Sequence, residues 1–311
     1  MNTVQQPASE IASTALVPEK HYQKIGGLRY FSSSLSSILT PVIATAVYSF
    51  SGLEAVLTVD LLTFAVAFIT LMFFIRIPKQ SAESAELSLI KSAKSGLDFL
   101  KSHKQVLMLI MYLSAINLVA SMYEAVLPAM VLSRKGGGTQ ALGAVSTCVG
   151  VATLIGSIIA TLMPKPKSRR RVICLSLLFS MSTENFFLAF GQTPLLWCTG
   201  AVLGWILIPM MSANLDVIMR TKVPCHMQGH VYSARNTLQF FTIPLGNFLG
   251  GLAVDTFAEP LMAAMPHNSL MCNIFGSGKG SGAALIFFII GIMGVAVCLI
   301  FNSNKHIKKI E

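Results

Sequence analysis

The sequence predicts an all-helical protein that crosses a membrane several times. Of its 311 residues, 53% are apolar and only 12% are charged, and the mean hydropathy is +0.67. Soluble domains carry roughly 25% charged residues. The apolar residues also gather in runs long enough to span a bilayer, and the basic residues gather between alternate runs. Together these three observations indicate that the chain folds in lipid.

A transmembrane helix needs about 20 predominantly apolar residues, and the sequence contains eight such runs. They cover residues 31–50, 53–75, 106–132, 141–163, 172–190, 195–219, 233–254 and 283–301. Backbone polar groups cannot stay unpaired in hydrocarbon, so each run is predicted to be a helix; a barrel would show short alternating strands instead. A large soluble helical protein would keep a polar face on its helices, and the last run, "ALIFFIIGIMGVAVCLIF", has none.

The net charge of +10 is distributed unevenly over these spans. All but three of the 23 lysines and arginines lie between spans on one side, and Arg134, Lys135 and Lys279 lie on the other. The positive-inside rule makes the first side cytoplasmic, with both termini there, in the cell membrane. Membrane topology therefore accounts for the basic residues, including the short loop "KPKSRRR", and no nucleic-acid partner is expected.

The chain contains a weak internal repeat. "ALVPEKHYQKIGGLRYF" (15–31) is echoed by "TKVPCHMQGHVYSARNT" (221–237). In each copy an acid, Glu10 or Asp216, lies seven residues before the valine of a Val-Pro pair, and an arginine, Arg29 or Arg235, lies eleven residues after that proline. Both copies start from the same membrane side and lead into an apolar helix. This spacing predicts two halves related by an axis along the membrane normal.

The two predicted halves are unequal, which sets the expected domain boundaries. Six spans form the second half (105–302), whereas the first half (1–78) holds the end of one span and two complete spans. Leucines and isoleucines at helical spacing among lysines predict an amphipathic linker on the inner membrane surface (79–104), and residues 303–311 form a cytoplasmic tail. We therefore expect a chain that lacks the first three to four spans of a doubled bundle.

Several short motifs in the right order resemble the major facilitator superfamily, in particular its macrolide-efflux-like branch of drug/proton antiporters. "VPEKHYQKIGGL" is similar to the family's loop between spans four and five, "DLLTF" to span six, "SGLDFLKSHKQVL" to the helix leading into span seven, and "VPCHMQGHVYSARN" with "IPLGNFLGGL" to spans ten and eleven. The family usually has Asn near Gly26 and Arg at His230, so the chain departs from the pattern there. The resemblance implies a major facilitator fold, spans five to twelve, and proton-coupled efflux by alternating access.

Acids inside the spans are the candidate proton-coupling residues, because charged groups in lipid are rare and usually functional. Glu124 has the most suggestive context, since Asn117 and Ser121 share its helix face and should line a cavity. Desolvation favours the protonated form of a carboxyl group, which suits reversible proton loading. Asp60 and Glu184 are further candidates. For each of these acids, a hydrogen-bonded structural role between helices is the alternative.

The repeated acids and arginines suggest a cytoplasmic gate. Placed at helix ends, Glu10 with Arg29 and Asp216 with Arg235 would form charge pairs that hold one state and separate in the other. Fixed structural ion pairs are the alternative.

The expected partners are a small lipophilic substrate, protons and the lipid bilayer, and the chain is expected to act as a monomer. The spans carry no lysine or arginine near mid-membrane, which favours neutral or cationic compounds over anions. No nucleophile, nucleotide or metal motif is apparent, so neither an enzyme nor a cofactor is expected. Two other functions stay open: a non-transporting membrane remnant or assembly partner, and an uptake permease of the same fold.

Overall fold

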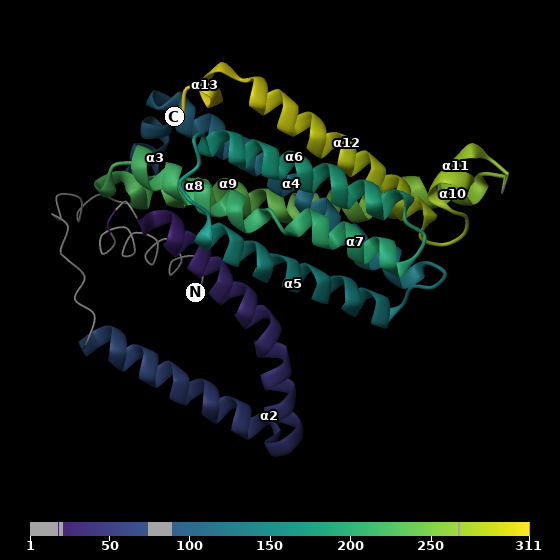
Figure 1. Cartoon of the computed structure of the whole chain (residues 1–311), viewed down its shortest axis with the longest axis horizontal. Coiled ribbons are helices and arrows are strands. Elements are labelled where there is room, and N and C mark those ends of the chain that lie inside the picture. Colours follow the sequence, from purple (N-terminus) through teal and green to yellow (C-terminus); the bar gives the residue numbers. More distant parts are fainter. Residues whose placement is uncertain (1–17, 19–20, 74–88, 267, 311) are drawn as a thin grey trace.

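The computed structural model describes residues 18, 21–73, 89–266 and 268–310, and this part of the chain is built of helices. In chain order they are α2 (Tyr22–Phe73), α3 (Leu89–Ser102), α4 (Lys104–Ser133), α5 (Thr139–Leu162), α6 (Arg169–Phe190), α7 (Pro194–Trp205), α8 (Ile208–Lys222), α9 (Cys225–Leu252), the π-helix η2 (Ala253–Ala258), α10 (Glu259–Ala264), α11 (Leu270–Phe275), α12 (Ser281–Ser303) and α13 (Lys305–Lys308). We call the packed set from α4 to α12 the main bundle (Figure 1).

The main bundle confirms the six spans predicted from residue 106 onward. Six of its helical segments are long and apolar enough to cross a membrane within the described residues. They cover 104–133, 139–162, 169–190, 194–222, 227–264 and 281–303. Their shared core is made of aliphatic and aromatic side chains, with Trp197, Tyr112 and Phe287 among the largest that are fully buried. The apolar runs therefore place these spans to within a few residues.

Two of these segments differ internally from the uniform helices that the sequence suggested. The run predicted at 195–219 divides into α7 and α8, with a break at Ile206 and Leu207. Pro209 explains the break, because a proline has no N–H to donate and its ring clashes with the carbonyl four residues earlier. The run predicted at 233–254 continues through η2 and α10 to Ala264. Its membrane segment is therefore longer than the apolar run alone.

The first half of the described chain is a single long helix. The runs 31–50 and 53–75 were predicted as separate spans, and the structure joins them in α2, up to Phe73. Figure 1 shows that α2 leaves the main bundle and then turns back on itself, so its two arms correspond to the two predicted runs. Pro41 and the Ser51–Gly52 pair are the residue types at which helices bend. Whether each arm spans the membrane stays a prediction.

The predicted amphipathic linker contains the helix α3. Its Leu100 is buried and its Gly96 lies against the backbone of His230 in α9, whereas Leu97 is 47% exposed. One face of α3 therefore packs on the main bundle.

The two ends of the main bundle differ in charge. The start of α6, the end of α8 and α13 lie at one end, which carries Arg169, Lys222 and Lys305; α10, α11 and the end of α4 lie at the other (Figure 1). We call the first the basic end and the second the Arg134 end. The segregation of charge matches the sequence prediction, and the assignment of the basic end to the cytoplasm stays a prediction.

Arg134 ties three helices together at its end. Its guanidinium donates hydrogen bonds to the carbonyl oxygens of Gly191, at 2.6 Å, and Phe275. Burial lowers the pKa of Arg134, and the nearby carboxylate of Glu259 raises it. Glu259 in turn accepts hydrogen bonds from the backbone N–H groups of Gly280 and Ala283 at the start of α12. A buried cation thus links α4, α6 and α11.

Replacing Arg134 with methionine should lower the melting temperature of the detergent-solubilised protein by about 5 °C or more, because each charge-assisted hydrogen bond contributes roughly 1.5 to 3 kcal/mol. Lys135→Met is the matched control, since Lys135 is the next residue and is exposed. We expect it to change the melting temperature by about 1 °C at most, as surface substitutions usually do. Equal melting temperatures for the two variants would show that Arg134 does not hold this end together.

Close packing at Gly156 gives a second stability test. A Cβ atom on Gly156 of α5 would lie 2.0 Å from the carbonyl oxygen of Ile206, at the break between α7 and α8. Gly156→Ala should therefore destabilise the protein by about 1 to 3 kcal/mol through overpacking. Gly143→Ala, in the same helix, meets no atom within 4 Å and should stabilise it by up to about 1 kcal/mol. Thermal unfolding followed by tryptophan fluorescence checks both, and a stable Gly156→Ala variant would contradict the packing.

Candidate functional site

The start of α2 packs tightly against the main bundle at the basic end. A Cβ atom on Gly26 would lie 3.1 Å from the Cα of Ala213 in α8, and one on Gly27 would lie 2.2 Å from the hydroxyl oxygen of Thr161 in α5. Only glycine allows backbones to approach so closely. We call this contact between α2, α5 and α8 the seam.

A cavity of about 260 Å³ lies inside the main bundle, and Tyr30 of α2 also lines it. Its polar lining comes from α2, α4, α6, α7 and α8: Tyr30, Asn117, Tyr123, Glu124, Ser180, Glu184, Asn185, Trp205 and Ser212. Apolar side chains, among them Ile116, Leu177 and Met211, complete it. Concave, mostly apolar sites with a few polar groups are typical of small-molecule binding sites.

Glu184 is the most enclosed acid of this cavity. Its side chain is 3% exposed, and its Oε1 accepts a hydrogen bond of 2.7 Å from the indole N–H of Trp205. A Cβ atom on Gly204 would lie 2.5 Å from the Cβ of Glu184, so the glycine makes room for the acid. Tyr123 lines the same cavity, and its buried hydroxyl lies near the carboxyl group of Glu184. Trp205 is thus a direct donor to Glu184, with Tyr123 beside it.

The structure brings together some of the residues predicted for proton coupling. Glu124 and Asn117 line the cavity with Glu184, and the side chain of Glu124 is exposed. Ser121 is buried and lies outside the cavity, where a Cβ atom on Gly246 of α9 would approach its Cβ to 2.8 Å. Asp60 lies in α2, and its side chain is outside the described residues. The roles of all these residues stay predictions.

Sequence reasoning missed the aromatic part of this site. Trp205 and Tyr123 lie in apolar runs and Tyr30 directly precedes one, and an aromatic side chain is unremarkable in such a position. A signal was available for the polar part of the site on α6. Ser180 and Glu184 are four residues apart and therefore share a helix face, as Asn117 and Ser121 do on α4.

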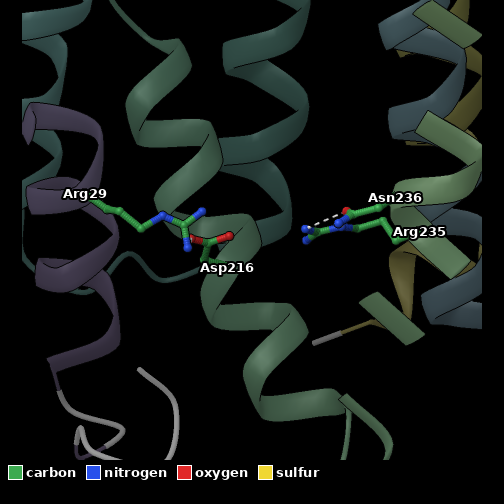
Figure 2. Close-up of polar contacts among 4 residues, drawn as sticks. All are labelled: Arg29, Asp216, Arg235 and Asn236. Atoms are coloured by element: carbon green, nitrogen blue, oxygen red, sulfur yellow. Dashed lines mark hydrogen bonds and ion pairs between the residues drawn. The ribbon is translucent and has the colours of Figure 1, made fainter. Parts of the chain in front are cut away.

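Two of the gate candidates, Arg29 and Asp216, lie next to the cavity. The carboxylate of Asp216 lies 3.9 Å from the guanidinium of Arg29 (Figure 2), and their side chains are 12% and 39% exposed. Arg29 is next to the cavity residue Tyr30, and Asp216 lies one helical turn beyond the cavity residue Ser212. This ion pair therefore joins α2 to α8 close to the cavity.

The observed ion pair joins the two repeat copies, whereas the sequence suggested pairs within each copy. Arg235 lies on α9, its guanidinium bonds to the side chain of Asn236 at 3.2 Å (Figure 2), and it stacks on the ring of Tyr232. Glu10 is outside the described residues. The pairing of Asp216 with Arg235 in another conformation stays a prediction.

The two copies nevertheless share a local backbone feature. The carbonyl oxygen of Pro18 accepts a hydrogen bond from the N–H of His21, and that of Pro224 accepts one from the N–H of Met227. Each hydrogen bond joins a proline to the residue three positions later, near the start of a long helix, α2 or α9. The equal spacing agrees with the repeat.

The fold and the cavity together define a multi-pass helical membrane protein with an acid-containing central site. The sequence model of the Major Facilitator Superfamily matches residues 2–247, and the chain belongs to this superfamily.

Two relatives carry the name Macrolide efflux protein A. The protein from Streptococcus pyogenes is 23% identical over 254 residues, which are 80% of this chain and 62% of the relative. The protein from Enterococcus faecalis is 23% identical over 245 residues, which are 77% of this chain and 75% of the relative. The chain therefore spans less than two thirds of the length of the first of these relatives.

Proposed function

We propose that the chain is a secondary transporter that exports neutral or cationic lipophilic compounds, macrolides among them, in exchange for protons. The cavity that contains Glu184 carries this proposal, because it combines an enclosed acid with aromatic walls. Glu184 is the proposed proton carrier, and Glu124 is the second acid facing the substrate. The superfamily membership and the similarity to macrolide efflux proteins support transport.

The chemistry of the cavity supports the substrate class. Its described lining residues include two acids and no lysine or arginine. An anionic substrate would need a buried cation there. Trp205, Tyr30 and Tyr123 offer flat apolar surfaces, and Met181 and Met211 adapt to different shapes. Such a lining suits lipophilic compounds of varied structure.

The seam supports an alternating-access cycle. In the proposed orientation the basic end is cytoplasmic, so Gly26, Gly27 and the Arg29–Asp216 pair close the cytoplasmic side of the cavity. Figure 1 shows α2 leaving the main bundle beyond this contact. We infer that this arrangement is the outward-facing state and that separation of the seam gives the inward-facing one.

Transport by purified protein in proteoliposomes tests the proposal. We expect an imposed pH gradient to drive the movement of a cationic dye, ethidium, and of a fluorescent macrolide across the membrane, and a protonophore to abolish it. Empty liposomes are the control. Dye movement in neither direction would favour a non-transporting membrane protein, and accumulation of substrate along with protons would favour an uptake permease.

A further inference from the structure

A second cavity lies at the basic end and shares no lining residue with the cavity of Glu184. Its volume is about 700 Å³, and it opens where the start of α2 meets the ends of α5 and α8 and the start of α6. Four basic side chains line it, Lys24, Lys165, Arg169 and Lys222. Its lining residues in the described part of the chain include no acid. The cavity therefore concentrates positive charge.

Neutral amides hold the arginine of this cavity in place. Its Nη1 donates hydrogen bonds to the side-chain oxygens of Gln23, at 3.1 Å, and Asn214, at 2.8 Å. Gln23 is buried, and its amide nitrogen donates to the carbonyl oxygen of Met163 at 3.0 Å. These contacts fix the position of the guanidinium. The three lysines are exposed, so their ammonium groups can turn toward a bound ligand.

We propose that this cavity binds a phosphate-bearing anion. Arginine matches phosphate geometry with two parallel donors, and lysines add compact point charges, so four such groups around one cavity favour phosphate over a neutral ligand. Basic pockets between helix ends at a membrane surface bind the head groups of anionic lipids. Phosphatidylglycerol and soluble inorganic phosphate share this chemistry, and the site accepts either source.

The position of the cavity gives the anion a structural effect. Lys24 comes from α2, whereas Lys165, Arg169 and Lys222 come from the main bundle. A bound phosphate would therefore bridge the two sides of the seam and stabilise its closed form. This role is separate from the proposed transport and does not depend on it.

Lipid binding to the purified full chain tests the site, with native mass spectrometry after exchange into detergent containing dioleoyl phosphatidylglycerol or dioleoyl phosphatidylcholine. We expect phosphatidylglycerol to be retained preferentially. The double variant Lys165→Gln, Lys222→Gln should weaken its binding about 25-fold, since each basic residue near an anionic lipid contributes roughly a factor of five. Lys308→Gln with Lys309→Gln, which removes the same charge from the exposed tail at the same end, should weaken it less than about twofold.

Inorganic phosphate, titrated into protein in uncharged detergent, separates the two sources. Binding of phosphate with the same dependence on Lys165 and Lys222, but no preference for phosphatidylglycerol, would support the site with a soluble anion as its ligand. Equal weakening by both double variants, or binding of neither probe, would overturn the proposal. Lys222→Gln alone, expected to weaken binding about fivefold, gives the same comparison should the double variant fail to fold.

Discussion

Replacement of Glu184 by glutamine should reduce pH-driven efflux at least tenfold. Exchange of substrate across the membrane in the absence of a pH gradient should stay unchanged. Glutamine has nearly the same volume, and its carbonyl oxygen can still accept the hydrogen bond from Trp205. It cannot take up or release a proton. Loss of coupling with intact exchange is therefore the expected signature of a proton carrier, and parallel assays in the same proteoliposomes measure both.

Glu124→Gln is the informative comparison for this variant, because both acids line one cavity and only Glu184 is enclosed. We expect Glu124→Gln to alter the preference for cationic over neutral substrates and to retain coupling. The reverse pattern, with coupling lost in Glu124→Gln and kept in Glu184→Gln, would show that Glu124 and not Glu184 carries the proton. Ser180→Ala, in the same cavity and without an ionisable group, controls for a change in cavity shape.

Charge reversal at Arg29 should have the second large effect. Arg29→Glu places a second carboxylate opposite Asp216, whose carboxylate lies 3.9 Å from the Arg29 guanidinium in the unaltered protein. Glutamate is shorter than arginine and position 29 is partly exposed, so the repulsion stays below the roughly 4 kcal/mol that two like charges at about 4 Å have near a protein surface. We expect transport to fall at least tenfold because the seam no longer closes. The double variant Arg29→Glu, Asp216→Arg should restore it to within about threefold of the unaltered protein.

The same rescue with Arg235 distinguishes the two possible partners of Asp216. If Arg29 is the partner in the closed state, Asp216→Arg should not rescue Arg235→Glu, because it would set two arginines against each other at the seam. Rescue of Arg235→Glu but not of Arg29→Glu would instead support pairing within the second repeat copy. Surface expression of each variant, measured by a C-terminal tag, excludes loss of protein as the cause.

Much of the fold was predictable from the sequence because lipid imposes a simple rule on it. A backbone in hydrocarbon must be helical, so the apolar runs from residue 106 onward give the spans directly. The break before Pro209 was less evident, since the run around it stays apolar throughout. Gly204 and Gly246 make close helix contacts, and each has a second glycine four residues away, Gly200 or Gly250, a spacing typical of tightly packed membrane helices.

The site was only partly predictable, because it depends on how distant segments meet. Helical spacing placed Asn117 with Glu124, but it could not show that Glu184 is the acid that becomes enclosed, since that depends on Trp205 in another helix. The Arg29–Asp216 pair links residues almost two hundred positions apart. The cluster around Arg169 likewise joins α2, α6 and α8, and no local pattern in the sequence connects them.

The break at Ile206 and Leu207 separates two contacts along one membrane-crossing segment. Trp205, which donates to Glu184, ends α7, whereas Asp216, which pairs with Arg29, lies in α8. A continuous helix would couple any tilt of α8 directly to the indole. In the proposed transport cycle, the break would let α8 tilt while Trp205 stays bonded to Glu184, so that opening toward one side of the membrane would not by itself make Glu184 release its proton.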